Sequence, residues 1–360
     1  YIWIRKIHLI FSLLVFGCIF RVSCCLITHM DNWKTKLHAD PLSWLLESNP
    51  WTRYRTLTDL LGMPVSATDP VKAKNELLQH SQILELAEEA KDWISIAPTR
   101  NNDSKISYFK LRMLADFGIT HEDLDLSVID KATEHVIEDM FAIRGTLPEK
   151  PGKGEKYQKP DLHADVWHIS PCNSPAITAA LLALGVQSEP LDSAVTALKY
   201  RWVDQTGWFC HFFFVESQHK KIQAGCPVAG LMALDVFSRV PGLKDSEQAR
   251  QAFEPIRFHK SFGKTIYYFG RSKKFWTFKY PFVWYNALYL ADVLTRFDFL
   301  KDEEVVMELV EWILRSQDEL GRFKPTSIFM EYKNWDFSNK KEPSPWITYL
   351  CCRILKQYYG

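Results

Sequence analysis

The chain has 360 residues, of which 47% are hydrophobic and 14% aromatic, so we expect a large packed core and exclude extensive disorder. The formal net charge is +1, and because Arg5, Lys6 and Arg21 precede Met30 with no acidic residue beside them, residues 30–360 carry 41 basic and 43 acidic side chains. This balance excludes an extended basic surface, so no nucleic-acid partner is expected.

The first 29 residues have two interpretations. Residues 7–20 form a 14-residue apolar run behind Arg5 and Lys6, which is the size of the hydrophobic part of a signal peptide but short for a membrane span. A signal would make the protein secreted or membrane-anchored. We prefer Met30 as the natural start, because no small-x-small cleavage site precedes it; residues 1–29 are then upstream sequence and the protein is cytoplasmic. Membrane association is expected only if residues 1–29 are retained.

Helical patterns begin soon after Met30. Glycine ends several of these helices, proline begins others, and their apolar residues recur every three or four positions. The first half of the chain predicts helices at residues 40–47, 50–62, 69–93, 107–118 and 126–143. A loop rich in proline, glycine and lysine follows at residues 145–160, and it is either a flexible lid or a plain surface excursion.

The second half alternates two kinds of helix. Apolar helices, some of them apolar on nearly every side, are expected to be buried, and amphipathic helices follow them with one face in water. The buried type is predicted at residues 175–185, 227–237, 281–297 and 345–356, and the amphipathic type at residues 191–202, 245–258 and 302–316. The clearest unit, residues 279–323, ends in a turn containing Gln317, Gly321 and Phe323.

The pattern repeats with a loose period. Six buried helices start near residues 51, 108, 175, 227, 281 and 345, which predicts tandem helical hairpins. Five amphipathic helices follow them, so the short helix at residues 40–47 can fill the remaining outer place and join the first unit to the last. We therefore expect residues 30–360 to form one all-α domain, an α/α toroid of about six hairpins. An open helical superhelix is the alternative.

These units resemble the terpene cyclase and protein prenyltransferase superfamily. The resemblance covers about residues 40–357 and is closest to bacterial proteins described as prenyltransferase-like or squalene-cyclase-like. The segments that carry it are residues 50–62, 226–227, 280–288, 317–323 and 342–348. It implies a toroid with a central cavity for an isoprenoid-like substrate.

The chain departs from this family in its reactive motifs. It has no Asp-x-Asp-Asp acid, since residues 123–126 read Asp-Leu-Asp-Leu, and it has neither the Asp-x-Cys pair that holds zinc nor an Asp-Asp-x-x-Asp motif for diphosphate. Neither named chemistry can therefore be assigned to particular residues.

Two segments before predicted buried helices concentrate reactive side chains. Asp165 and His168 could form an oriented acid-base pair, or a local hydrogen bond that orders the loop. Cys210, His219 and Cys226 could bind zinc, since thiolate and imidazole are its preferred ligands, although their spacing matches no standard motif. Ordinary half-buried thiols are the alternative.

Aromatic residues recur near the starts of the buried helices. A cavity lined by them would suit a carbocation or an apolar chain, although aromatic residues at helical spacing are more often part of the core. Arg55 could meet an anionic headgroup, or could be a solvated surface residue. The candidates for substrate binding are Tyr54, Arg55, Trp167, Trp208, Trp284, Tyr285 and Trp346.

Three hypotheses for function follow. The first is a terpene-cyclase-like or prenyltransferase-like protein that binds an apolar or isoprenoid-like small molecule in its cavity, with zinc as the one candidate cofactor. The second is a non-catalytic binding or scaffold toroid. The third is a carbohydrate-processing enzyme built on the same helical ring.

Overall fold

The computed structural model describes residues 32–92, 103–130, 132, 142–144, 167–169, 173–200, 225–261 and 269–360. This part of the chain is helical apart from one two-stranded antiparallel ribbon. Its elements are η1 (Asn32–Lys36), α2 (Leu42–Leu46), α3 (Pro50–Arg55), η2 (Thr56–Leu60), α4 (Thr68–Leu78), α5 (Ser81–Ala90), α6 (Ser107–Asp116), β1 (Ala142–Arg144), β2 (Trp167–Ile169), α8 (Asn173–Ala183), α9 (Glu189–Tyr200), α11 (Pro227–Phe237), α12 (Glu247–Ser261), α13 (Ala287–Leu294), η5 (Asp298–Leu300), α14 (Glu304–Arg315), η6 (Met330–Tyr332), η7 (Asp336–Ser338) and α15 (Pro345–Tyr359). Among these, none of the helices combines the length and the hydropathy that a membrane span requires.

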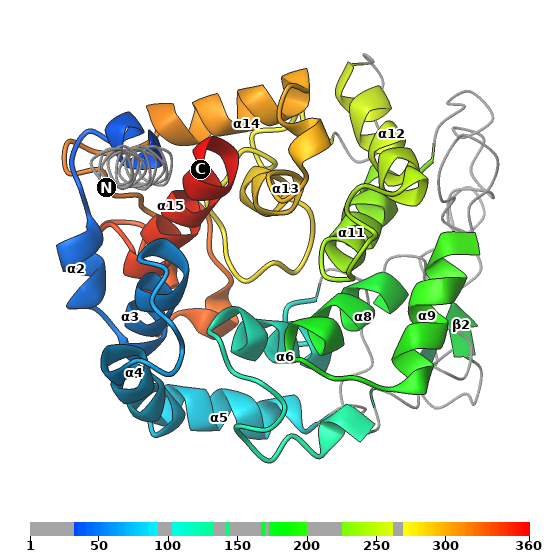
Figure 1. Ribbon diagram of the computed structural model, residues 1–360, viewed down its shortest axis with the longest axis horizontal. Helices are drawn as coiled ribbons and strands as arrows, with labels where there is room; N and C mark the ends of the chain where they lie inside the picture. The colour runs from blue at the N-terminus through cyan, green and yellow to red at the C-terminus, as the bar shows by residue number, and fades with distance from the viewer. Residues whose placement is uncertain are drawn as a thin grey trace, which may run out of the picture.

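The helices form two layers (Figure 1). The inner layer contains α3, α6, α8, α11, α13 and α15, and α11 is buried at every residue, as its apolar sequence predicts. The outer layer contains α4, α5, α9, α12 and α14, each packed on an inner helix or on its outer neighbour. The amphipathic sequence of α14 explains its place, because Val305, Val306, Leu309, Val310 and Ile313 are buried on one face whereas Glu304 and Glu311 are exposed.

Contacts along the inner layer follow the order of the chain. From α6 onward each inner helix packs on the next, and α15 also packs on α3, near the other end of the chain. Phe117, just beyond α6, contacts Trp51 of α3, with 5.5 Å between ring centroids. Helix α2 contacts both α3 and α15, which is the bridging position that the sequence predicted for it.

The turn after α14 fastens the N-terminal segment. The backbone nitrogen of His38 donates to Gln317 Oε1 at 2.7 Å, and Gln317 Nε2 donates to the carbonyl of Lys36 at 3.2 Å. Gly321 lies so close to Ala39 that a Cβ at position 321 would be 2.2 Å from the Ala39 carbonyl oxygen. The turn predicted to end one repeat therefore also holds the N-terminal segment against the end of α14.

Two predicted helices have different bounds. The segment at residues 69–93 contains two helices, α4 and α5, because His80 between them has an extended backbone, with φ −73° and ψ 128°, that ends the helical run. The helix expected from residue 281 begins at Ala287, since the side chain of Asn286 caps it by accepting from Tyr289 N at 2.9 Å.

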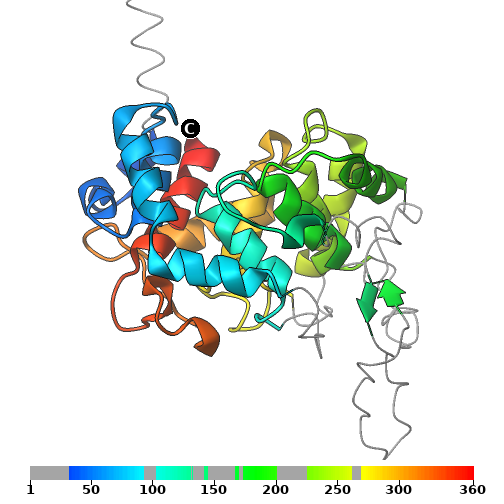
Figure 2. The same ribbon diagram turned by 90° about the horizontal axis from the view of Figure 1, so that it is seen from below.

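The ribbon is the other difference from the sequence analysis. Strand β1 occupies the end of the segment predicted as a helix at residues 126–143, and it pairs with β2 so that Ile143 lies opposite His168. Antiparallel pairing satisfies backbone groups that two isolated three-residue segments would leave unpaired. Figure 2 shows this ribbon at the lower right and the loop between α14 and α15 at the lower left, whereas the C-terminus of α15 lies on the upper side of the molecule.

Candidate functional site

A cavity of about 600 Å³ lies where the inner helices end. Every inner helix of the described chain contributes residues at or just beyond its C-terminus, from Tyr54 on α3 to Gln357 on α15. The sequence predicted a cavity among the aromatic residues near the opposite ends, the starts, of these helices. Helix C-termini carry unpaired carbonyl groups and the negative end of the helix dipole, so they favour positively charged side chains.

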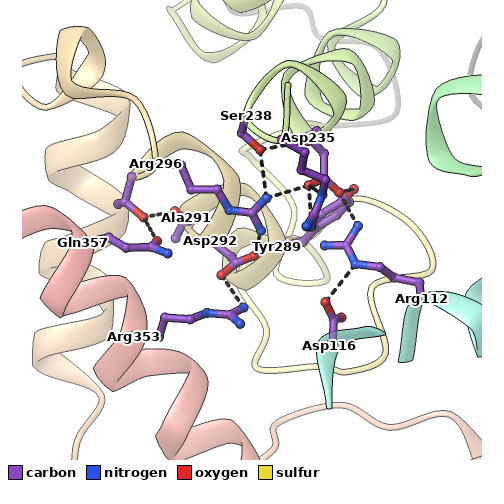
Figure 3. A network of polar contacts seen from close by, with 12 residues as sticks. Arg112, Asp116, Asp235, Ser238, Tyr289, Ala291, Asp292, Arg296, Arg353 and Gln357 are labelled. Atoms are coloured by element: carbon purple, nitrogen blue, oxygen red, sulfur yellow. Dashed lines mark hydrogen bonds and ion pairs between the residues drawn. The ribbon is translucent and has the colours of Figure 1, made fainter. Parts of the chain in front are cut away.

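Charged side chains occupy much of the cavity wall. Those that line it are Arg55, Asp59, Asp116, Arg239, Arg296, Arg353 and Lys356. Behind them lie Arg112, Asp235 and Asp292, whose side chains are 6%, 0% and 0% exposed. Figure 3 shows most of these residues converging from α6, α11, α13 and α15, and we call the nine arginines and aspartates together the arginine–aspartate network.

Asp235 on α11 is the most highly connected residue of this network. Its carboxylate pairs with Arg112, with Arg239 at 3.0 Å and with Arg296 at 2.7 Å, and it accepts a hydrogen bond from the Tyr289 hydroxyl at 2.9 Å. Burial would raise the pKa of Asp235, but the three guanidinium charges outweigh it and hold that pKa well below its usual range. Asp235 is therefore ionised at neutral pH.

Asp292 on α13 has the same role on the next helix. It pairs with Arg296 and with Arg353 Nη2, the latter at 2.6 Å. Burial again opposes ionisation, but Arg296 and Arg353 together lower the pKa of Asp292 to about 2. Arg296 thus bridges two buried carboxylates and links α11 to α13, while Arg353 links α13 to α15.

Tyrosines extend the network at both ends. Arg112 pairs with Asp116 at 2.9 Å, and Asp116 accepts from the Tyr280 hydroxyl at 3.1 Å. At the other end, Arg353 Nη1 donates to the Tyr349 hydroxyl at 3.2 Å, and that hydroxyl donates to Asp59. Arg55 then pairs with Asp59 at 3.0 Å.

The network has more positive than negative charge. Within the described chain it combines five arginines with four aspartates, and Lys356, which donates to the carbonyls of Asp59 and Leu60, lines the same cavity. Burial, together with the charges of Arg112 and Arg296, lowers the pKa of Arg239 to about 10 even though Asp235 opposes the shift. Bringing together this many buried cations costs free energy that an added anion would recover.

Some guanidinium groups also have unused donors. Arg55 Nε, Arg112 Nη2 and Arg353 Nε are buried and make no hydrogen bond to the described residues. A buried N–H group without a partner costs about 1–3 kcal/mol. The network therefore contains donors that its own carboxylates do not satisfy.

An aromatic cluster fills the inner layer beside the network. Trp346 is fully buried, and its ring centroid lies 4.8 Å from Phe117, 5.5 Å from Tyr280 and 4.9 Å from Tyr349. Substrate binding by Trp346 stays a prediction, and the packing of its indole against other aromatic rings, with no accessible surface, favours a place in the core.

The other predicted binding residues divide into three groups. Tyr54 and Arg55 line the cavity, so the structure brings these two together. Trp284 and Tyr285 are half-buried before α13, away from the cavity wall, and burial raises the pKa of Tyr285 to about 12. Trp208 lies outside the described residues, and Trp167 is described only as part of strand β2.

The predicted catalytic and metal residues are mostly untested. Asp165, Cys210 and His219 lie outside the described residues, and His168 is placed in β2 rather than in a loop. Cys226 is buried at the start of α11. No group of three or more potential ligands in the described part of the chain is arranged to hold a metal ion, so zinc stays a prediction.

The sequence analysis missed most of the network, although a signal was present. Four arginine–aspartate pairs are spaced four residues apart, which places both members on one helix face. These pairs are Arg55 and Asp59, Arg112 and Asp116, Asp235 and Arg239, and Asp292 and Arg296. Charged side chains in helices that are otherwise apolar need charged partners. Their recurrence at several inner helices predicts that these side chains pair with one another where the helices pack together.

Comparison of the chain with protein-family models, with curated proteins and with solved structures finds no match. The resemblance to terpene cyclases and prenyltransferases therefore stays a prediction, and the interpretation of the site depends on its geometry.

Proposed function

We propose that the chain is an α/α toroid, in which six inner helices close into a ring. The succession of contacts from α6 to α15, the packing of α15 on α3, and the contact between Phe117 and Trp51 support this closure. Helix α2, which touches both α3 and α15, supports it from the outer layer. Such a ring has a single axial cavity where the six helix ends converge, and ligands bind in concave sites of this kind.

We propose further that this cavity binds a small anionic molecule. The observation that carries the proposal is that Arg55, Arg239, Arg296 and Arg353 all line this one cavity, within a network that has more arginines than aspartates. Arginine suits such a role because its planar group donates two parallel hydrogen bonds to phosphate or carboxylate oxygens. A volume of about 600 Å³ exceeds what a single phosphate needs, so an organic body fits beside the anionic group.

The geometry favours this ligand over the wholly apolar one expected from the sequence. Trp346 and its aromatic neighbours are packed together, whereas the cavity wall is charged. An isoprenoid fits the proposal through a diphosphate headgroup, and a glycan fits it through carboxylate or sulfate groups. A scaffold without a ligand would leave the excess charge unbalanced.

Isothermal titration calorimetry at low salt tests the proposal with three probes: inorganic pyrophosphate, farnesyl diphosphate and farnesol. We expect the two diphosphates to bind and farnesol not to bind, with affinities that fall as salt is added because the attraction is electrostatic. Arg55→Gln removes a cavity charge and should weaken binding. Arg257→Gln is the matched control, because the side chain of Arg257 is 55% exposed beside Glu254. Equal affinity for farnesol and its diphosphate, or no binding of either diphosphate, would overturn the proposal.

A further inference from the structure

The charge of Arg239, just beyond the end of α11, is the least compensated on the cavity wall. Asp235 is its one carboxylate partner among the described residues, at 3.0 Å. The same carboxylate also pairs with Arg112 and with Arg296, so three guanidinium groups share one negative charge. The other two arginines each have a second carboxylate four residues away, whereas Arg239 has none in the described chain.

The other two arginines of the wall are compensated more fully. Arg55 pairs with Asp59 at 3.0 Å, and no other arginine of the network pairs with that carboxylate. Arg353 pairs at 2.6 Å with Asp292, which it shares with one other arginine. An added negative charge therefore gains most beside Arg239, where the existing one is divided among three cations.

The pKa of Arg239 reflects this shortage of negative charge. Burial and the charges of Arg112 and Arg296 lower it, whereas the pKa values of the other arginines of the network are raised. A cation that neighbouring cations destabilise is stabilised when an anion binds beside it.

The side chain of Arg239 is also accessible from the cavity. It lines the cavity and is 20% exposed, compared with 12% for Arg296. Its Nε and Nη2 both contact Asp235 Oδ1, at 3.2 Å and 3.0 Å, and Nη1 has no partner among the described residues. A guanidinium group that uses one edge for a buried carboxylate keeps the Nη1 donors for a second oxyanion.

Neutral residues line the cavity near the end of the preceding inner helix. Gly118, Thr120 and Ala183 contribute to the wall, and each keeps part of its surface exposed. Ala183 ends α8, and α8 packs on α11, the helix that precedes Arg239 (Figure 1). An anion held by Arg239 therefore has small uncharged residues on the side toward α8.

We infer that Arg239 binds the anionic group of the ligand, and that the neutral body of the ligand lies over Ala183 at the end of α8. This inference rests on the proposed anion-binding function, and it names the ligand as a small organic phosphate or carboxylate. Arg239 donates from Nη1 to an oxygen of the oxyanion, while Asp235 holds the guanidinium group in place. The small residues toward α8 leave room for a ring or a short chain.

Calorimetry with inorganic pyrophosphate tests the role of Arg239. We expect Arg239→Gln to weaken binding about tenfold or more, because it removes a charge-assisted hydrogen bond. Arg55→Gln should weaken binding only about twofold to threefold, through lost long-range attraction. Arg239→Lys keeps the charge without the planar group, so it should recover only part of the affinity.

The Arg239 variants leave no buried carboxylate unpaired, because Asp235 keeps Arg112 and Arg296, and circular dichroism checks that they fold. Wild-type protein that binds pyrophosphate, with Arg55→Gln losing as much affinity as Arg239→Gln, would overturn the role of Arg239 and leave the proposed function standing. Wild-type protein that binds neither pyrophosphate nor farnesyl diphosphate would overturn the proposed function itself.

Phenyl phosphate and benzoate test where the ligand body lies, and the tighter binder of the two identifies the oxyanion. Ala183→Leu should weaken binding of that probe about fivefold or more and leave pyrophosphate binding unchanged, because a larger side chain fills space without changing the charge. Ala176→Leu, at a half-buried position in the first turns of α8, is the matched control and should leave both unchanged. Equal losses for pyrophosphate and the phenyl probe in Ala183→Leu would overturn the placement of the body, as would wild-type protein that binds pyrophosphate but neither phenyl probe.

Discussion

Asp235 on α11 and Arg296 beyond α13 form a 2.7 Å ion pair although 61 residues separate them in the chain. Arg296 also reaches Asp292, so one guanidinium group fixes the ends of two inner helices relative to each other. A buried ion pair often adds little net stability compared with apolar packing, because both charges lose their water. Here the ion pairs restrict how the inner helices are arranged, because each buried arginine is paired only when the helices bring a carboxylate next to it.

Removing the carboxylate at the centre of the network should destabilise the fold strongly. Asp235→Asn keeps the shape of the side chain but leaves Arg112, Arg239 and Arg296 without their shared counter-ion. We expect the free energy of unfolding to fall by about 3–5 kcal/mol, as when one partner of a buried ion pair is lost. Urea denaturation followed by circular dichroism measures this change.

The control for Asp235→Asn is Glu254→Gln, which breaks the exposed pair with Arg257. Exposed pairs contribute at most about 1 kcal/mol, so this variant should unfold like the wild-type protein. Equal stability of the two variants would show that the network is dispensable for folding.

Acid should weaken the fold through Asp292. Its pKa is depressed to about 2 in the folded protein, so the stabilisation that its ionised form provides is complete above the unfolded value near 3.8 and is lost as the pH falls toward 2. This one carboxylate should account for roughly 2 kcal/mol of that loss between about pH 5 and pH 2. Chemical denaturation at a series of pH values measures the slope.

Asp292→Asn supplies the comparison for the pH dependence. The variant should be less stable at neutral pH but should lose less stability between pH 5 and pH 2, because the group that takes up a proton is gone. Asp298→Asn, at an exposed position with a side chain 88% exposed, should keep the wild-type slope. Identical slopes for all three proteins would contradict the role of Asp292.

The sequence predicted the helices better than the site, for physical reasons. Apolar periodicity and terminal glycine or proline are local signals, and they place helices such as α11 and α15 within a few residues. The network depends on which helix ends meet, and that is decided by tertiary packing. An aromatic residue at helical spacing, such as Trp346, has the same local pattern whether it lines a cavity or fills a core.

Trp346 therefore gives a direct test of core against ligand binding. Trp346→Ala should lower the free energy of unfolding by about 3–5 kcal/mol, because it leaves a large cavity among Phe117, Tyr280 and Tyr349. Trp284→Ala, at a half-buried position, should cost clearly less. Thermal unfolding measures both, and a Trp346→Ala protein that stays stable but loses pyrophosphate binding would support the ligand-binding role.

Gly321 tests the closure of the chain ends with a matched glycine. Its φ is +69°, and a Cβ there would lie 2.2 Å from the carbonyl oxygen of Ala39, so Gly321→Ala must both strain its own backbone and push the N-terminal segment away from the turn at Gln317. Gly242 has a φ of +77° but open space around it, so Gly242→Ala has the same backbone strain without the collision.

The difference between these two variants isolates the contact between the chain ends. We expect Gly242→Ala to lower the free energy of unfolding by about 1 kcal/mol and Gly321→Ala to lower it by about 2–4 kcal/mol, measured by urea denaturation. Hydrogen exchange in a peptide covering η1 should rise in Gly321→Ala alone, because the His38 and Gln317 hydrogen bonds open when the segment moves. Equal losses in the two variants, with η1 still protected, would mean that the turn does not hold the N-terminal segment and that closure depends on α2 and α15 instead.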